Sequence, residues 1–315
     1  MNLAPVVLFV YNRPKHTEET LVALSENDLA KDSVLYIYAD GAKENASEET
    51  LNNIAETRRV IKKKQWCAEV NIIESPKNKG LANSIIEGVT NIVNKYGKII
   101  VLEDDLITSK GFLKYMNDGL VKYKEDEKVM QISGFCFPAV GISKNHSSFF
   151  IPLTASWGWG TWNRAWRSFD AEATGYERLE QDKDLERKFN LDNICQYSQM
   201  LFNQMESKGV DSWAIRWWWT VFKMQGIVLY PDQSLIKNDG YGDEGTHTKG
   251  KNPFASEGFD RNYYVSYFPL KAIINSENFG LVKDCIRNST NRGHQHEREN
   301  NLNKLKRRFI QLFNK

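Results

Sequence analysis

The stretch Lys98-Ile-Ile-Val-Leu-Glu-Asp-Asp-Leu106 joins an apolar run to three consecutive acids, Glu103, Asp104 and Asp105. An apolar run of this length between polar residues is typical of a buried strand, so the carboxylates are expected at its C-terminal end. Ligands of open α/β sheets bind there. Adjacent carboxylates need a partner that offsets their repulsion, and a divalent cation bridging to phosphates is a common one. The stretch therefore predicts a metal-assisted site for a phosphorylated substrate; the alternative is that the acids cap a following helix.

The composition is that of a globular protein without a strongly charged partner. The chain has 315 residues, 41% of them hydrophobic and 12% aromatic, which is ample for a packed core. Its 42 basic and 40 acidic residues leave a net charge of +2, so no nucleic-acid partner is indicated. The four cysteines are scattered without zinc-site spacing, which fits a reducing compartment. The N-terminus lacks signal-peptide features, and no apolar stretch reaches the ~20 residues of a membrane span. We therefore expect a cytoplasmic protein.

Strand and helix patterns alternate through the first third of the chain. Strands are predicted over 6–10, 34–38 and 70–73 and in the apolar run from Lys98 to the acids, and helices over 17–25, from 47 onward and over 81–96. This order indicates an α/β fold with a mostly parallel central sheet flanked by helices. Further on, the patterns predict a helix over 112–123, a strand over 129–133, a polar helical stretch over 179–205 and a strand over 227–230.

Seven short motifs between residues 5 and 250 resemble, in their order, nucleotide-sugar glycosyltransferases of the GT-A fold. The match is to bacterial relatives of the N-acetylglucosaminyltransferase I type, which are similar to glycosyltransferase family 2. The motifs are Leu8-Phe-Val-Tyr-Asn-Arg-Pro14, Tyr38-Ala-Asp40-Gly41, Asn78-Lys-Gly-Leu81, Val101-Leu-Glu-Asp-Asp-Leu106, Trp157-Gly-Trp-Gly160, Val210-Asp-Ser-Trp213 and Gly245-Thr-His247. The resemblance implies hexosyl or N-acetylhexosaminyl transfer from a nucleotide diphosphate sugar, expected to be a UDP-sugar, with manganese or magnesium.

The same resemblance suggests how one domain is divided. Residues 1–110 would form the nucleotide-sugar-binding α/β half, and residues 111–270 the aromatic-rich half that binds the acceptor and carries out catalysis. Residues 271–315 would form a C-terminal tail with an amphipathic helix. The acceptor would be a glycan or a lipid-linked saccharide, as in the synthesis of a bacterial surface polysaccharide.

The donor side of the site is expected at the strand ends. Asp105 is the expected direct metal ligand because a cation there stabilises the charge that develops on the diphosphate leaving group. Asp104 is expected on the ribose or an outer-shell water, and Glu103 in support. The further donor-binding candidates are Asp40 for a base imide, Asn12 and Arg13 for ribose or phosphate, and, more weakly, Lys79. The alternatives are a simple turn at Asp40 and a surface charge at Arg13.

Two residues of the second half are candidates for the chemistry. Asp211 is the candidate base that takes the acceptor hydroxyl proton in an inverting transfer, with Trp213 and Trp217 expected to shield it from water. It could instead cap the helix that follows. Where eukaryotic relatives carry two adjacent acids, this chain has Asp211 and then Ser212. His247 in a glycine-flanked loop is a candidate second metal ligand, or a hydrogen-bonded surface residue.

Some of the tryptophans are expected to bind the acceptor, and others are expected to pack in the core. Trp157 and Trp159 are expected to stack on acceptor sugars, because neighbouring glycines leave aromatic faces open. Trp213 is expected to stack on sugar rings because it flanks Asp211. Trp162 and Trp166 are expected in the core.

The tail offers a possible surface contact. Residues 303–315 place apolar side chains at helical spacing beside Lys and Arg, so the tail is expected either on the inner face of an anionic membrane or docked on protein.

Two other functions remain open from the sequence. A sugar nucleotidyltransferase is also α/β and metal-dependent, but it needs a glycine-rich phosphate loop after its first strand, and Tyr11-Asn-Arg-Pro14 has no glycine. A non-catalytic glycan-binding protein would keep the aromatic surface without turnover.

Overall fold

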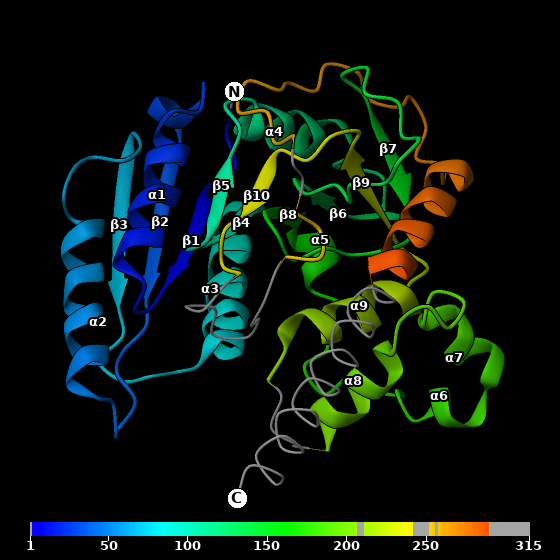
Figure 1. Ribbon diagram of the computed structural model, residues 1–315, viewed down its shortest axis with the longest axis horizontal. Helices are drawn as coiled ribbons and strands as arrows, with labels where there is room; N and C mark the ends of the chain where they lie inside the picture. Colours follow the sequence, from blue (N-terminus) through cyan, green and yellow to red (C-terminus); the bar gives the residue numbers. More distant parts are fainter. Residues whose placement is uncertain (1, 207–210, 242–251, 256–257, 290–315) are drawn as a thin grey trace, which may run out of the picture.

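The computed structural model describes residues 2–206, 211–241, 252–255 and 258–289. Its centre is an eight-stranded sheet in the order β3-β2-β1-β4-β8-β6-β9-β7, which runs across the whole molecule (Figure 1). The strands of this sheet are β1 Val6–Val10, β2 Val34–Ala39, β3 Glu69–Glu74, β4 Lys98–Glu103, β6 Val129–Ser133, β7 Ser148–Ile151, β8 Trp159–Trp162 and β9 Ile227–Pro231. A separate antiparallel pair joins β5 Leu106–Thr108 to β10 Ile236–Asn238.

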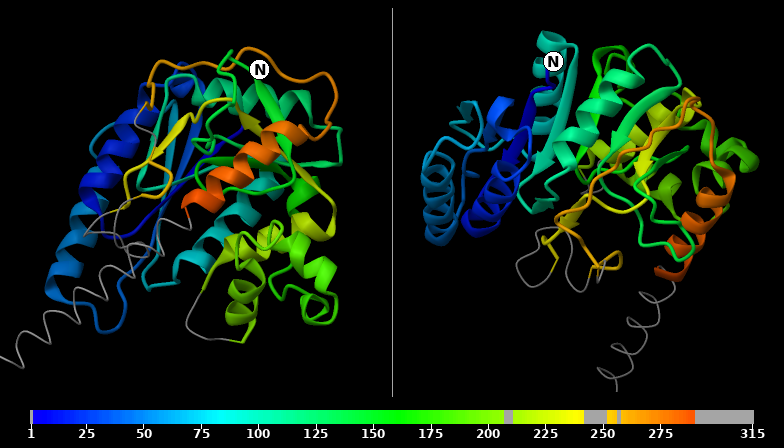
Figure 2. Two further views of the ribbon diagram at one scale, coloured as in Figure 1. Left: turned by 45° about the vertical axis from the view of Figure 1, so that its right-hand side comes forward. Right: turned by 90° about the horizontal axis from the view of Figure 1, so that it is seen from above.

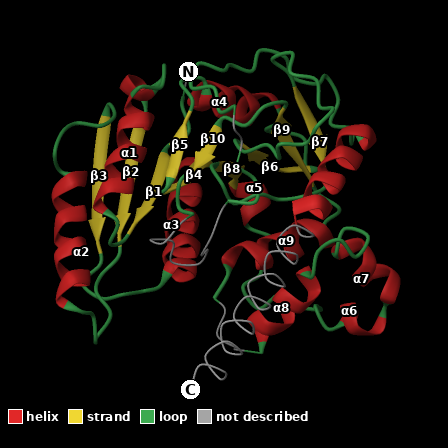
Figure 3. Ribbon diagram, viewed as in Figure 1, coloured by secondary structure: helices red, strands yellow, loops and turns green. Residues whose placement is uncertain are grey.

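Helices cover both faces of the large sheet (Figures 2 and 3). They are α1 Pro14–Ser25, α2 Glu48–Ile61, α3 Leu81–Tyr96, α4 Phe112–Lys122, α5 Asn163–Trp166, α6 Arg178–Gln181, α7 Lys183–Phe189, α8 Tyr197–Met205 and α9 Trp213–Lys223, with a 3₁₀ turn η1 Ala30–Asp32. Residues 276–289 are also helical. The alternation of buried side chains along β1 decides which helices lie on which face: Leu8 packs in one core with α1, α2 and α4, and Phe9 in another with α3, α5 and α9.

The first half of the sheet is parallel, as the sequence predicts. β1 pairs with β2 on one side and β4 on the other, and β3 lies outside β2. The chain therefore moves outward from β1 to β3 and then returns to the opposite side of β1 as β4. The point between β1 and β4 is a topological switch point, where open α/β sheets bind their ligands at the carboxyl ends of the strands.

The second half of the sheet is mixed, because β8 is antiparallel to β4 and β6, and β7 is antiparallel to β9. Strand β8 comes from the aromatic segment, for which the sequence predicts no strand. Its glycine serves packing: a Cβ on Gly160 would lie 2.9 Å from the carbonyl oxygen of Ile99 and 3.0 Å from Met116 of α4. Gly160 therefore lets α4 approach the sheet, and it does not open an aromatic face.

The polar stretch over 179–205 is three short helices and not one. Asp182 begins α7 by accepting hydrogen bonds from the amides of Asp184 and Leu185. After α7, Leu191, Asp192 and Asn193 all have positive φ angles near 60°, a conformation that no α-helix continues through. Within the described residues, no helix combines the length and apolar character needed to cross a membrane.

Candidate functional site

Arg13 binds both acids that follow β4. Its Nη2 donates to Asp104 and lies 3.0 Å from Asp105 Oδ2, and its Nε donates to Asp104 Oδ2 at 3.4 Å. The three side chains meet at the switch point, since Arg13 follows β1 and the acids follow β4. The partner that offsets the carboxylate repulsion in this structure is therefore a residue of the chain itself. Nη1 of Arg13 makes no hydrogen bond within the described part of the chain and is free to meet an anion.

Burial and mutual repulsion change the protonation of the acids. Burial, followed by the charges of Asp105 and Asp104, raises the pKa of Glu103 to about 8 against the opposing effect of Arg13. Burial also raises the pKa of Asp104 to about 6, although Arg13 lowers it in part. Burial lowers the pKa of Arg13, but the two aspartates more than offset this, so its net change is a rise. At neutral pH the cluster thus holds a protonated Glu103 beside an ion-paired aspartate pair.

The end of β10 closes the site over Asp105. The backbone oxygen of Asp105 accepts a hydrogen bond from the amide of Asp239 at 2.9 Å. A Cβ on Gly240 would lie 2.0 Å from Asp105 Oδ2, so only glycine fits at that position without moving the carboxylate. Tyr241 follows, and burial and then the charge of Asp105 raise its pKa. The sequence did not single out Gly240 or Tyr241; the glycine-rich Asn238–Tyr241 loop was the available signal.

Asp40 organises the loop before α3. Its carboxylate accepts hydrogen bonds from the backbone amides of Gly41, Lys79 and Gly80 and from Asn78 Nδ2, at 2.8 to 3.2 Å. Both carboxylate oxygens are thus engaged inside the protein, which differs from the expected contact with a base imide. Asp40 therefore holds the loop before α3 against the end of β2.

The remaining donor candidates lie in different surroundings. Asp104 is only 4% exposed and bound to Arg13 through both oxygens, so the expected ribose contact has no support in this geometry. Lys79 Nζ binds both oxygens of Glu87 on the surface, away from the acids. Asn12 is partly buried beside Arg13.

Asp211 lies close to the Asp40 loop, although 171 positions separate the two in sequence. Its Oδ2 is 3.9 Å from where a Cβ on Gly80 would be. The side chain is 54% exposed, and Arg216 Nη2 binds it at 3.0 Å. Ser212, and not Asp211, caps α9 by accepting a hydrogen bond from the amide of Ile215. The expected shielding of Asp211 by tryptophans is not observed; Arg216, which the sequence did not single out, holds its carboxylate instead.

The tryptophans expected to bind an acceptor have different environments. Trp159 is completely buried in β8 and stacks on Trp213 with ring centroids 4.9 Å apart, so its assignment to an acceptor surface is wrong. Trp213 is 4% exposed but lines a pocket on its other side. Trp157 is partly exposed, lines the same pocket and meets Tyr241 edge to face at 5.9 Å. Trp162 and Trp166 are in the core as predicted.

Among the described residues at the switch point, Asp105 is the one candidate ligand for a hard cation. Asp105 offers a carboxylate that is 15% exposed at the edge of the site, and carboxylate oxygens are what Mg²⁺ and Mn²⁺ prefer. The described residues contain no cluster of three or more His, Cys, Asp or Glu side chains placed to hold a metal. His247, the other expected ligand, lies outside the described residues, as do residues 303–315 of the tail. A cation held at Asp105 would take its further oxygens from a bound phosphate or from water.

Comparison with known proteins gives distant structural resemblance. No protein-family profile and no curated protein matches the sequence. Among solved structures, the mannosyltransferase PcManGT from Pyrobaculum calidifontis, determined with GDP-Man and Mn²⁺, is 15% identical over 50% of this chain and 44% of its own, with a TM-score of 0.33. Mouse xyloside xylosyltransferase 1 is 11% identical over 70% and 82%, with a TM-score of 0.35. A UDP-glucose pyrophosphorylase complexed with UDP-glucose is 17% identical over 49% and 64%, with a TM-score of 0.27. At such low scores these likenesses carry no weight for function, which has to be argued from the site itself.

Proposed function

We propose that this protein is a glycosyltransferase of the GT-A type that moves a sugar from a nucleotide diphosphate sugar to a saccharide or lipid-linked saccharide. The observation that carries the proposal is the Arg13, Asp104 and Asp105 cluster at the switch point between β1 and β4. A cation and two carboxylates at the carboxyl ends of parallel strands are suited to a diphosphate and its counter-ion. The motif order found in the sequence supports the same function.

The donor would lie in the first half, over residues 1–110. Arg13 would meet the diphosphate through its free Nη1 while its other nitrogens stay on the acids. Asp105 would hold Mn²⁺ or Mg²⁺, which when bound offsets the negative charge of the leaving nucleotide. Asn12 lies next to Arg13 and would contact the ribose or phosphate. A UDP-sugar is the donor that we propose on the resemblance.

The acceptor would lie in the second half, over residues 111–270. Asp211 would accept the proton of the attacking hydroxyl, and its exposure of 54% leaves room for that hydroxyl to approach. Arg216 would fix the orientation of the carboxylate through its bond at 3.0 Å. Attack on the side opposite the leaving group would invert the anomeric configuration. Trp157 at the pocket rim would stack on the acceptor.

The experiment that tests the proposal is a screen of nucleotide sugars for nucleotide release with manganese, magnesium or EDTA. We expect release of the nucleoside diphosphate from one donor class, stimulated by metal, and at least a hundredfold loss in Asp105→Asn. Asp118→Asn is the matched control, since Asp118 pairs only with Lys114 on the surface of α4. Release of pyrophosphate from a nucleoside triphosphate and a sugar phosphate would instead identify a nucleotidyltransferase. Donor binding without turnover, unchanged in Asp105→Asn, would identify a non-catalytic glycan-binding protein.

A further inference from the structure

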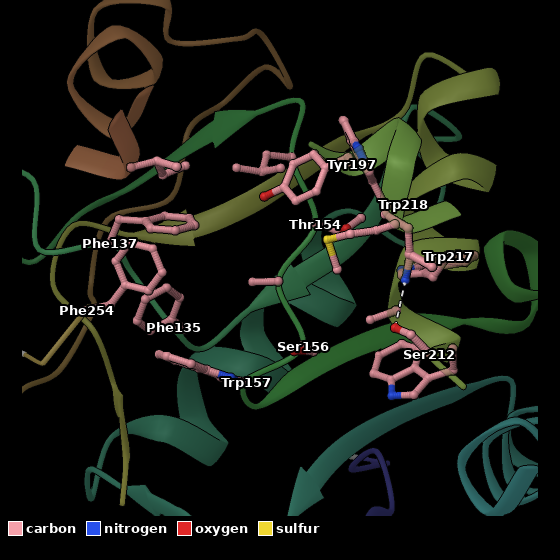
Figure 4. A pocket seen from close by; sticks show the side chains of 17 residues that line it. Phe135, Phe137, Thr154, Ser156, Trp157, Tyr197, Ser212, Trp217, Trp218 and Phe254 are labelled. Carbon is pink, nitrogen blue, oxygen red and sulfur yellow. Dashed lines mark hydrogen bonds between the residues drawn. The ribbon is translucent and has the colours of Figure 1, made fainter. Parts of the chain in front are cut away.

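An aromatic pocket lies next to the candidate base. It encloses about 240 Å³. Figure 4 shows it as a cleft between two facing groups of rings, Phe135, Phe137, Trp157 and Phe254 on one side and Tyr197 and Trp218 on the other. These residues come from the segments that follow β6, β7 and β10 and from α8 and α9, so they belong to the second half of the molecule.

The lining is apolar to an extent that is unusual for a saccharide site. None of the described residues that line the pocket carries a charge or a side-chain amide. The Ser212 hydroxyl already accepts a hydrogen bond from the backbone amide of Ile215. The hydroxyls of Thr154 and Ser156 make no hydrogen bond within the described part of the chain, and both residues lie along the same pocket. Sugars are oriented by several directed polar groups, whereas this lining suits a hydrocarbon with one or two polar contacts at its end.

The pocket borders the candidate site at two places. Ser212 and Trp213 line it, and Asp211 directly precedes them. On the other side, Trp157 lines the pocket and contacts Tyr241 at 5.9 Å, and the charge of Asp105 acts on Tyr241. A group held in the pocket would therefore lie beside residues that adjoin both the candidate base and the acids that are proposed to hold the donor.

We propose that this pocket binds the hydrocarbon part of a glycolipid acceptor and thereby presents the attached sugar to Asp211. The role of the bound molecule as an acceptor rests on the proposed glycosyltransferase function, whereas the binding of its hydrocarbon part does not. Burial of each methylene between the aromatic walls supplies the affinity. The free hydroxyls of Thr154 and Ser156 bind the oxygen that links the chain to the sugar.

Isothermal titration with n-octyl β-D-glucoside, kept below its critical micelle concentration, tests the pocket without donor or metal. Methyl β-D-glucoside carries the same sugar without the chain and is the matched ligand. We expect the octyl compound to bind at least tenfold more tightly to the full chain. Met200→Glu places a carboxylate in the lining at a side chain that is already 44% exposed, so folding is preserved, and binding should fall at least tenfold. Met224→Glu, at a methionine that is 58% exposed outside the pocket, should bind as the wild type does.

Three results would overturn the assignment. One is equal binding of the octyl and methyl compounds, and another is octyl binding that Met200→Glu leaves unchanged. The third is octyl binding that occurs only after residues 290–315 are removed, since the tail would then be the natural occupant of the pocket. Because none of these measurements uses a nucleotide sugar, a failed nucleotide-release screen and a failed pocket assignment would be told apart.

Discussion

The donor end and the acceptor end of the candidate site differ in how their functional groups are partnered. At the donor end, Asp40, Asp104 and Asp105 are all bound to other groups of the protein, and the cation that neutralises the last two is Arg13. At the acceptor end, the pocket offers aromatic faces and the hydroxyls of Thr154 and Ser156, which have no hydrogen-bond partner among the described residues. Asp211 lies between them, bound on one side to Arg216 and exposed on the other.

This difference indicates two kinds of recognition. A ligand at the donor end has to add to or replace bonds that already exist, so binding there depends on charge and on accurate geometry. A ligand at the acceptor end fills an open space and gains mostly from burying apolar surface. Substitutions that remove a charge at the donor end should therefore change stability and activity together, whereas substitutions in the pocket should change the choice of acceptor.

Asp211→Asn gives the largest expected effect, because it removes the group placed between the two ends. Without a base, transfer should fall by about 10³-fold while donor binding stays within a factor of two. Steady-state turnover and titration of the nucleotide measure the two separately. Asp192→Asn is a matched control, since Asp192 is also ion-paired and exposed, but its partners are Arg187 and Lys283 and it does not line the pocket. Transfer that survives in Asp211→Asn would remove Asp211 from the mechanism.

Arg13→Met tests whether the ion pairs of Arg13 with Asp104 and Asp105 stabilise the donor end. Removing the guanidinium leaves the carboxylates of Asp104 and Asp105 together without a cation, so the free energy of unfolding should fall by about 3 kcal/mol. Urea unfolding measures it. Adding Asp104→Asn to Arg13→Met should recover part of the loss, because one of the opposed charges is then gone.

The matched control for that experiment is Arg59→Met, at an exposed pair with Glu56 on α2. Its effect should stay below about 0.5 kcal/mol, as for other surface ion pairs. Equal losses in Arg13→Met and Arg59→Met would show that the cluster is not held by Arg13.

The two ends also differ in how well the sequence predicts them. Apolar runs and helical spacing gave β1, β6 and the helix α3 with their observed bounds, and β4 as the apolar run that ends at the acids, because local pattern and burial agree there. The sequence correctly placed the acids at the end of β4. It did not predict that Arg13 is their partner, because Arg13 and Asp104 are 91 positions apart and only the pairing of β1 with β4 brings them together.

The aromatic half shows where such prediction ends. In a continuous strand Trp157 and Trp159 would lie on the same face, because they are two positions apart, but β8 begins only at Trp159. Trp159 is consequently buried between α3 and α9, while Trp157 remains in the loop at the pocket. Residue type alone does not separate a tryptophan that binds from one that packs.

Gly240→Ala should disturb the donor end without removing any of its charges. A methyl group there would lie 2.0 Å from Asp105 Oδ2 and would force the carboxylate to rotate. We expect activity to fall by about 10²-fold, as for a misplaced catalytic group, with unfolding little changed. Gly258→Ala, where a Cβ has open space, is the matched control and should keep full activity. Wild-type activity in Gly240→Ala would show that the orientation of Asp105 is not critical.

Glu103→Gln gives the smallest expected effect and tests whether burial or charge dominates at the donor end. The pKa of Glu103 is about 8 in the folded protein against an ordinary value of 4.5, so between these pH values the folded state holds a proton that the unfolded chain releases. The wild type should therefore lose stability as pH rises from 4.5 to 8, with Asp104, Asp105 and Arg13 as the charged neighbours. Glutamine keeps the neutral form, so the variant should gain on the order of 2 kcal/mol relative to the wild type across this range. Urea unfolding in EDTA at pH 5 and pH 8 measures the difference.

The matched control is Glu125→Gln, at a side chain that is 84% exposed, which should have the same stability as the wild type at both pH values. If the difference were the same at both pH values, Glu103 would be ionised in the fold and Arg13 would outweigh burial.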